Sequence, residues 1–432
     1  MSLGKRAFGI SMAVALTASL FGGAVAAQDP VVILSTQMVP EEEAAKMRDE
    51  IMAGFDGDFD FIGSETGPFV DTVRAEAESG SGDTSVVLSL HGELSTLGAE
   101  GLLMDLSDIA AEVDAAPAFM ELGKLGTDEQ LYIPMMVATY IMAARTEALD
   151  YLPEGADPMA LTWDQVAEWG ANLQAETGER LLGFPFGEDG LRHRLFQGYM
   201  YPSFTGKVNN EFATQAGVDM WNWLLGAKEY INPQSTTYGF MQEPLQSGEV
   251  WVAWDHTARL IDALNRDPEG FIALPSPAGP AGRAFMPVIV GLGIPKTAPD
   301  PEAAMEVIKH LLMPETQGIT LEQVSFFPVA AGEVPANVGE GVASQQAAIA
   351  AQNNAPDALP ALLPVGLGDQ GGANSDVFKD ALSAIVVDGG DPAEVLAGLA
   401  PTLQGIFDST GATGWSPDEV DLFIPHQANV RI

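Results

Sequence analysis

Three short apolar runs near the start of the chain are each followed by polar residues and then by a helical pattern. The runs are Val31–Leu34, Phe59–Ile62 and Ser85–Leu90. A strand, a polar loop and a helix repeated in this way are typical of a doubly wound α/β sheet, in which ligands bind at the carboxyl ends of the strands. A solvated loop is the alternative for each of the residues that follow the strands. The residues we expect along this edge are Gln37, Glu65 and His91.

A longer apolar stretch, Leu131–Arg145, reads LYIPMMVATYIMAAR and carries its only charge at its last residue. Pro134 has no N–H to donate, so it marks an edge, a bulge or a crossing between sheets. The residues after it are apolar on both faces, which predicts a strand buried beneath helices. We interpret this stretch as a strand that leaves one lobe and enters another. Tyr140 then lines a cleft, or it is a core tyrosine with a satisfied hydroxyl group.

Two further patterns predict elements later in the chain. Leu161–Gln165 begins a helix with a capping box, because Thr162 can cap it and Gln165 stands three residues further on. The apolar run Pro287–Ile294 predicts a strand, and a helix with one apolar side is predicted over Asp300–Leu312.

Length and charge limit the classes of protein to consider. The chain has 432 residues, which exceeds what one core usually accommodates, so two lobes are expected. The formal net charge of −41 excludes a general nucleic-acid surface, which needs clustered Lys and Arg. There is no cysteine, which excludes disulfides, thiol catalysis and cysteine metal sites. The histidines at 91, 193 and 256 lack the spacing of metal ligands, so neither a metal nor another cofactor is predicted.

The first 27 residues are predicted to be a cleaved export signal. Lys5 and Arg6 precede the apolar run Ala7–Val25, and small residues at 24–27 supply a cleavage site. A membrane anchor is the alternative, but polar residues and glycines within the run make it a poor span. No later apolar stretch reaches the ~18–20 residues that a membrane helix needs. We therefore expect a soluble periplasmic protein without a lipid anchor.

Several motifs follow one another in a recognisable order. They are LYIP, LTWDQVAEW, SGEVWVAWD, ALPSPAGP, VIVGLGIPKTAPDPEAAMEVIKHLL and SFFPV. In this order they resemble the family 1 extracellular solute-binding proteins, the carbohydrate-binding subunits of bacterial ABC importers. The resemblance runs from about residue 31 to residue 407. One strand that often ends as Ala-Ala-Met and Gly in the family reads Val-Ala-Trp-Asp here, so the ligand contacts near it are expected to differ.

The resemblance implies a two-lobed periplasmic binding protein-like fold of type II, in which each α/β lobe is a sheet flanked by helices. It also implies that the chain crosses between the lobes three times, from the first lobe to the second, back to the first and again to the second. The strand at 287–294 is the natural return to the first lobe. We expect residues 28–136 and 290–313 to form the N-terminal lobe, and 137–289 and 314–432 the C-terminal lobe. It also implies a monomer that is not an enzyme. Such a protein captures a sugar, oligosaccharide or polyol glycoside and delivers it to ABC permease subunits with a cytoplasmic ATPase.

A sugar site needs aromatic faces for ring C–H groups and planar polar groups for hydroxyl pairs. Trp254 and Asp255 follow a predicted strand over Val250–Ala253 and offer both, provided that the turn after Ala253 opens. The alternative places Trp254 in the core and Asp255 at a helix cap. Phe327 lines the cleft or fills the hinge core. The predicted ligand-binding residues are Gln37, Glu65, His91, Tyr140, Arg192, Trp254, Asp255 and Phe327.

Arg192 belongs to an aromatic-rich segment, Phe184–Tyr201, that also contains Arg194. It either pairs with Glu188 or Asp189, or it recognises an anionic sugar. The second interpretation rests on its planar fork of donors, which suits carboxylate, sulfonate or phosphate.

Two other functions and one unrelated motif complete the analysis. A sensory subunit that presents its ligand to a receptor is one alternative, and a secreted glycosidase is another, although any acid-rich chain contains carboxylate pairs. The final residues, ATGWSPDEVDLFIPHQANVRI, resemble the histidine-bearing segment of type III ketoacyl-carrier-protein synthases. That chemistry needs an acylated cysteine, so His426 is not predicted to be catalytic. We expect this tail to pack on the second lobe or to be disordered.

Overall fold

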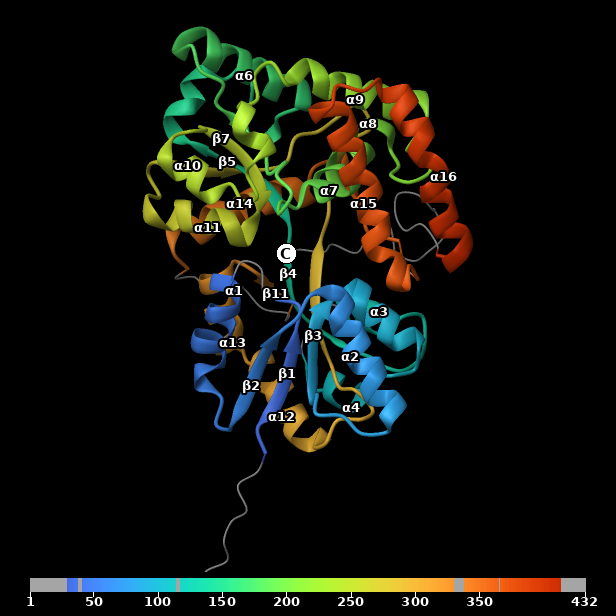
Figure 1. Cartoon of the computed structure of the whole chain (residues 1–432). Helices are drawn as coiled ribbons and strands as arrows, with labels where there is room; N and C mark the ends of the chain where they lie inside the picture. Colours follow the sequence, from blue (N-terminus) through green and yellow to red (C-terminus); the bar gives the residue numbers. More distant parts are fainter. Residues whose placement is uncertain (1–28, 38–40, 114–116, 330–337, 365, 413–432) are drawn as a thin grey trace, which may run out of the picture.

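The computed structural model describes residues 29–37, 41–113, 117–329, 338–364 and 366–412. The predicted export signal and the tail that carries His426 lie outside these ranges. The described residues form two lobes, one below the other in Figure 1, and each lobe contains a sheet flanked by helices. The two-lobed α/β fold predicted from the sequence is therefore confirmed.

The first lobe is built on a six-stranded sheet in the order β11-β4-β10-β3-β1-β2. Strand β1 pairs in parallel with β2 and β3, which confirms the three predicted strands, whereas β10 runs antiparallel between β3 and β4. The bounds are β1 (Val31–Ser35), β2 (Phe59–Gly63), β3 (Val86–Leu90), β4 (Ile133–Ala138), β10 (Val288–Gly293) and β11 (Phe327–Pro328).

Helices cover both faces of this sheet, because its strands are apolar on both sides. Ile33 and Leu88 pack in one buried cluster, and their neighbours Leu34 and Val87 pack in another. The helical segments are α1 (Glu41–Lys46), η1 (Met47–Ile51), η2 (Met52–Gly54), α2 (Thr66–Ser79), α3 (His91–Ala99), α4 (Ser107–Ala110), α5 (Pro117–Gly123), α12 (Pro301–Leu312) and α13 (Pro314–Val324). The side chain of Asp300 caps α12, as its position before the predicted helix suggests.

The second lobe contains a four-stranded sheet in the order β6-β7-β5-β8, and a separate pair of strands, β9 and β12. The strands are β5 (Tyr140–Arg145), β6 (Leu182–Gly183), β7 (Val252–His256), β8 (Phe271–Leu274), β9 (Arg283–Phe285) and β12 (Ala358–Pro360). The helical segments are η3 (Thr146–Tyr151), η4 (Pro158–Ala160), α6 (Trp163–Thr177), α7 (Arg192–Leu195), η5 (Phe196–Met200), α8 (Tyr201–Thr205), α9 (Gln215–Ala227), η6 (Pro233–Thr236), α10 (Gln242–Ser247), α11 (Thr257–Arg266), α14 (Glu340–Asn353), η7 (Gly368–Gln370), α15 (Gly371–Leu382), η8 (Ser383–Val387) and α16 (Pro392–Thr410). The predicted capping box of Thr162 and Gln165 is present at the start of α6. Within the described residues, no helix combines the length and apolar character that crossing a membrane requires.

A single residue, Thr139, joins β4 of the first sheet to β5 of the second. Its hydroxyl group lies 2.9 Å from the hydroxyl of Tyr199 and donates to the carbonyl of Met286 over 2.9 Å, so both partners fix the crossing from the second lobe. The pairing of β4 with β10 shifts register beside Pro134, so the bulge that is one of the expected outcomes at this proline is present.

The third crossing lies later than expected. Residues from 314 onward are expected in the second lobe, but α13 packs on η1, and β11 pairs with β4 of the first sheet. The chain therefore stays with the first lobe through Pro328. Pro314 ends one helix pattern and begins the next, because proline is well accommodated at the first helical position. The lobe boundary predicted between residues 313 and 314 is therefore wrong, because it falls between two helices of the first lobe.

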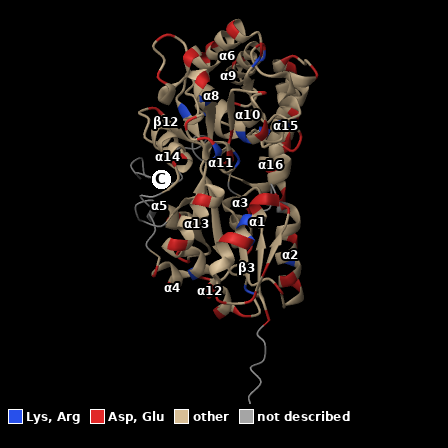
Figure 2. Ribbon diagram, turned by 90° about the vertical axis from the view of Figure 1, so that its left-hand side faces the viewer, with Lys and Arg blue, Asp and Glu red and all other residues tan. Residues whose placement is uncertain are grey.

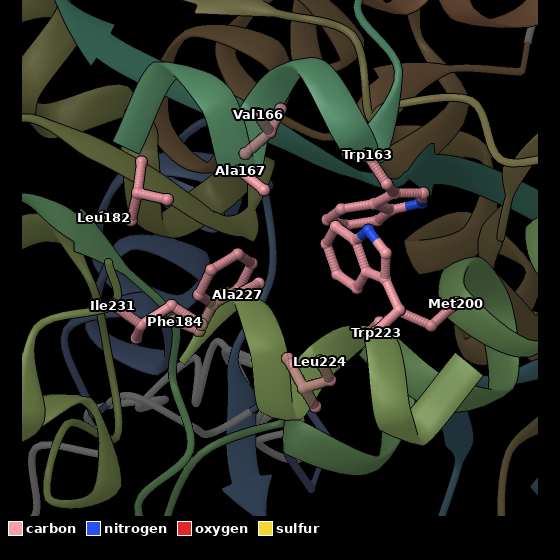
Figure 3. Close-up of a pocket in the computed structure, with 10 residues that line it drawn as sticks. All are labelled: Trp163, Val166, Ala167, Leu182, Phe184, Met200, Trp223, Leu224, Ala227 and Ile231. Carbon is pink, nitrogen blue, oxygen red and sulfur yellow. The ribbon is translucent and has the colours of Figure 1, made fainter. Parts of the chain in front are cut away.

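The core of the second lobe contains one internal cavity that is too small for a ligand. This cavity has a volume of about 10 Å³ and lies between α6, α9 and β6 (Figure 3). Its lining is entirely apolar and includes Trp163, Phe184 and Trp223. Such a volume is about that of one water molecule, and an apolar site of that size stays dry.

Candidate ligand-binding site between the lobes

The loops after β1, β2 and β3 lie along one edge of the first sheet. The N–H group of Ser64 donates to the carbonyl of Ser35 over 2.8 Å, which joins the ends of β1 and β2. The hydroxyl of Thr36 lies 2.9 Å from that of Ser89, which joins the ends of β1 and β3. This arrangement places the loops where the sequence predicts them, at the carboxyl ends of parallel strands.

The three residues predicted on these loops differ in their surroundings. Gln37 is buried, and Glu65 is exposed just before α2. His91 is half-buried, and its Nδ1 atom lies 2.6 Å from the hydroxyl of Tyr132. Burial lowers the pKa of His91 to about 4, so the imidazole is neutral at pH 7. Nearby Glu93 accepts a hydrogen bond from Ser89 over 3.4 Å.

The structure corrects the expected placement of Trp254. Its side chain is fully buried and stacks on Tyr140, with ring centroids 5.0 Å apart and planes 8° from parallel. Its Nε1–H group donates to the hydroxyl of Ser276 over 3.1 Å, and Tyr199 contacts the ring edge-on. The expected exposed stacking face is therefore absent, and Trp254 belongs to the core of the second lobe.

Asp255 is likewise buried rather than open to the cleft. Strand β7 continues to His256 instead of ending at Ala253, so successive residues keep pointing to opposite faces. Asp255 accepts hydrogen bonds from the N–H groups of Met241 and His256 over 2.9 and 2.7 Å, and it pairs with Arg259 at 3.4 Å. All of its acceptor capacity is thus directed at its own lobe.

Tyr140 and Phe327 lie close to the crossing. Tyr140 is only 2% exposed, and Arg194, Arg259 and Glu43 act electrostatically on its hydroxyl group. Burial raises the pKa of Tyr140 to about 12 despite both cations. Phe327 is fully buried in a cluster that spans the hinge, so the hinge-core alternative describes its position.

Arg192 does not pair with either of the acids considered from the sequence. Its Nη1 group donates to the carbonyl of Phe186 over 3.1 Å, and its buried Nε atom has no hydrogen-bond partner among the described residues. Arg194, two residues further on, donates to the amide of Gln197 over 3.2 Å and faces the first lobe, where it acts on Glu93. Residues two apart on a helix point in roughly opposite directions, so only one of the two arginines can face the cleft.

A polar cavity of about 250 Å³ lies between α1 of the first lobe and α10 and α11 of the second. Glu43 from α1 and Arg259 from α11 line it on opposite sides. Burial raises the pKa of Glu43 to about 7, while Arg259 and Lys46 act in the opposite direction. The volume is slightly below the usual range of ~300–1,000 Å³ for small-molecule pockets, so the cavity is suited to a compact polar ligand.

Ion pairs connect the lobes on two sides of the gap. Lys46 of α1 lies 3.5 Å from Asp262 of α11, and Arg74 of α2 donates to Asp369 of η7 over 2.6 Å. Figure 1 places α1 and α11 on the left of the molecule and α3 and α15 on the right. The lobes are therefore in contact along both flanks of the gap.

Acidic and basic side chains face one another across this gap. Acidic residues are spread over both lobes in Figure 2, whereas some of the few basic residues lie beside α10 and α11, next to the first lobe. Glu43 and Arg259 line one cavity, and the charge of Arg194 opposes the rise in pKa that burial gives Glu93, so each lobe offers groups that can hydrogen-bond a ligand held between them. No three His, Asp or Glu side chains of the described ranges gather closely enough to hold a metal ion.

Comparison with known proteins places this geometry in a family. A family model described as bacterial extracellular solute-binding protein matches residues 42–318. Comparison with curated proteins finds no match. The chain is similar to UgpB from Mycobacterium tuberculosis, solved in complex with glycerophosphocholine, at 19% identity and a TM-score of 0.71 over 88% of this chain and 99% of that one.

Two further solved structures share the fold. The GacH receptor of Streptomyces glaucescens, solved unliganded and with acarbose, is 16% identical with a TM-score of 0.68 over 88% of this chain and 98% of that one. Maltose-bound MalE3 of T. maritima is 16% identical with a TM-score of 0.67 over 87% of this chain and 99% of that one. Since the family model covers more than half of the chain, and the fold agrees with it, this chain belongs to the bacterial extracellular solute-binding proteins.

Proposed function

We propose that the protein captures a carbohydrate between its two lobes and delivers it to the permease of an ABC importer. The observation that carries the proposal is that the two lobes bring opposite kinds of polar group to the gap, Glu43 and Glu93 from the first lobe and Arg259 and Arg194 from the second, and no ion pair joins them among the described residues. A polyhydroxylated ligand needs both acceptors and donors around it, and here each lobe supplies one kind. The carbohydrates held by the GacH receptor and MalE3, which share this fold, support the same ligand class.

The remaining parts of the proposal follow from this role. The chain is exported to the periplasm after loss of its signal segment, acts as a monomer, and binds its ligand without converting it. Neutral and acidic carbohydrates and polyol glycosides are all within the class. Gln37, Glu65 and His91 stay candidate contacts from the first-lobe edge, and Tyr140 is a candidate contact from the second lobe.

Closure around the ligand is the proposed mechanism. A ligand that contacts both lobes shifts an existing equilibrium between open and closed forms toward the closed form. The crossing at Thr139 provides a short hinge between the two sheets. Exposed ion pairs such as Lys46–Asp262 contribute only ~0–1 kcal/mol each, so ligand contacts must supply most of the preference for closure.

A thermal-shift screen tests the proposed function. We expect a carbohydrate from a panel of monosaccharides, oligosaccharides and polyol glycosides to raise the melting temperature. A ligand present at ~100 times its Kd adds ~2.7 kcal/mol to the free energy of unfolding, which such a screen detects readily. Small-angle scattering with that ligand should show a smaller radius of gyration, and incubated oligosaccharides should stay intact. Stabilisation by amino acids or peptides alone would contradict the proposal.

Closure is expected to depend on pH through Glu43. Its pKa is about 7 in the contacting lobes but 4.5 in a solvated state, because burial disfavours the carboxylate more than Arg259 and Lys46 favour it. The contacting form therefore takes up a proton between these values. The stability that protonation of Glu43 gives to the contacting form, relative to the open form, is fully present below pH 4.5 and is lost as the pH rises through about 7.

Scattering on the ligand-free protein between pH 5 and pH 8 measures this dependence. We expect the radius of gyration to increase with pH in the wild type and to change much less in Glu43→Gln, which cannot ionise. The variant Glu42→Gln, in the same turn of α1, serves as the control and should keep the wild-type profile. An identical slope in all three proteins would show that another group is responsible.

A further inference from the structure

Arg194 makes no ion pair with another described residue, although the chain is strongly acidic. The sequence contains 60 acidic and 19 basic residues, so most cations find a carboxylate easily. Arg194 is half-buried, donates to Gln197, and has no ion-pair partner in the described part of the chain. Arg192 likewise makes no ion pair among the described residues, whereas Arg259 pairs with Asp255 and Lys379 with Asp376.

Several buried polar groups of α7, the helix that contains Arg194, and of α15 also lack partners among the described residues. Gln197, which accepts from Arg194, donates in turn to the amide oxygen of Asn374 over 3.0 Å. The other end of that amide, Nδ2, is buried and has no acceptor among the described residues. The buried Nε atom of Arg192 and the buried Nδ1 atom of His193 also have no hydrogen-bond partner among the described residues. Asn374 is 1% exposed and His193 is 7% exposed, so water does not compensate readily.

Positive charge accumulates at the same place. Burial holds the pKa of His193 well below its usual range, and Arg194, Lys379, Arg192 and Arg259 all lower it further. Four cations thus act on one buried imidazole that stays uncharged. Two of these cations are ion-paired, so Arg192 and Arg194 carry the positive charge that a ligand would meet here.

We propose that the ligand carries an oxyanion, a carboxylate or phosphate group on the carbohydrate, and that Arg194 binds this group with Asn374 as a second donor. A guanidinium group matches both oxyanions with two parallel hydrogen bonds. A neutral sugar would leave Arg194 without a counter-charge in a closed gap from which water is excluded, which is costly. This inference rests on the proposed function, because it names the class of carbohydrate bound at the same site.

Glu93 across the gap does not oppose this assignment strongly. Burial raises the pKa of Glu93, which reduces the negative charge that an incoming anion would meet. In its protonated form the carboxyl group can also donate a hydrogen bond to a sugar hydroxyl or to the oxyanion. The first lobe then recognises the hydroxyl groups, and the second lobe recognises the charge.

Calorimetry with matched sugars tests the proposal. The probes are glucose, glucuronate, galacturonate and glucose 6-phosphate, together with maltose as a neutral oligosaccharide. We expect a charged sugar to bind the wild type at least about tenfold more tightly than its neutral partner, and less tightly as salt is added. Preference for the uronates identifies a carboxylate ligand, and preference for glucose 6-phosphate identifies a phosphate ligand.

Two variants locate the effect. Arg194→Gln should weaken binding of the charged sugar by roughly ten- to a hundredfold, as expected for a lost charge-assisted hydrogen bond, with an unchanged melting temperature. Arg180→Gln removes an exposed charge from the same lobe and should bind as the wild type does.

The outcomes separate the two proposals. Equal or tighter binding of glucose or maltose, unaffected by Arg194→Gln, would overturn the oxyanion inference and leave carbohydrate capture standing. Equal losses in both variants would also overturn it, because they would reflect net charge alone. If no carbohydrate of the panel binds, the proposed function fails and the inference fails with it.

Discussion

Replacing Trp254 with alanine is expected to lower the free energy of unfolding by about 3–5 kcal/mol, because it removes a fully buried aromatic side chain. The indole fills the core of the second lobe between Tyr140 and Tyr199 and donates to Ser276. Its loss leaves a cavity and removes one of the two hydrogen bonds of the Ser276 hydroxyl, which still donates to the carbonyl of Tyr140. Urea denaturation followed by circular dichroism measures the change in the free energy of unfolding.

Two matched variants make this test specific. Trp251→Ala removes a half-buried indole of the same segment, so a smaller loss is expected there. Trp254→Phe keeps a ring against Tyr140 but not the hydrogen bond to Ser276. Its free energy of unfolding should therefore lie between those of the two alanine variants. If Trp254→Ala were as stable as the wild type and lost only ligand binding, the ring would have to contact the ligand after all.

Removing Asp255 is expected to have a comparable effect, by a different mechanism. Asp255→Ala leaves Arg259 buried without its counter-ion, and breaking a buried ion pair from one side costs about 3–5 kcal/mol. It also removes the acceptor for the N–H groups of Met241 and His256. Chemical denaturation again gives the change in stability.

The control is Asp262→Ala. Asp262 lies on α11, as Arg259 does, and this substitution breaks its exposed ion pair with Lys46 of α1. Such pairs contribute ~0–1 kcal/mol, so this variant should be nearly as stable as the wild type. The double variant Asp255→Ala/Arg259→Met should recover part of the loss, because it removes the uncompensated charge as well. Equal stability of Asp255→Ala and Asp262→Ala would contradict the structural role assigned to Asp255.

The parts of the fold that follow from local patterns were predictable. Parallel strands buried on both faces read as nearly continuous apolar runs, which is why β1 and β3 are predictable, whereas β2 at the sheet edge contains Asp60 and is predictable from the loop and helix that follow it. The Thr162 capping box is a short-range feature that depends on four neighbouring residues, and it formed as the sequence indicates. The crossing at Thr139 was visible as an apolar stretch too long for one ordinary strand.

The candidate site was harder to predict, because it depends on where elements end and which way they face. Strand β7 continues three residues beyond the predicted end at Ala253, and this places Trp254 in the core and directs Asp255 toward its own lobe. The segment that contains Arg192 was recognised, but sequence alone did not reveal that Arg194 faces the first lobe. Glu93 stands two residues from His91, in the first turn of α3, where the sequence predicts the end of a strand and a polar loop. Its charged neighbour Arg194 belongs to the other lobe, so local sequence does not reveal it.

The position of β10 has a consequence for how the protein folds. Strand β10 fills the space between β3 and β4, although the whole second-lobe sheet lies between β4 and β10 in the sequence. The first lobe therefore cannot complete its sheet until a distant part of the chain has been brought back to it. Closing so long a loop has an entropic cost before any contact is gained, and pairings of this kind slow folding. The second lobe has the same dependence, because β12 pairs with β9 although the returning strands β10 and β11 of the first lobe lie between them in the sequence.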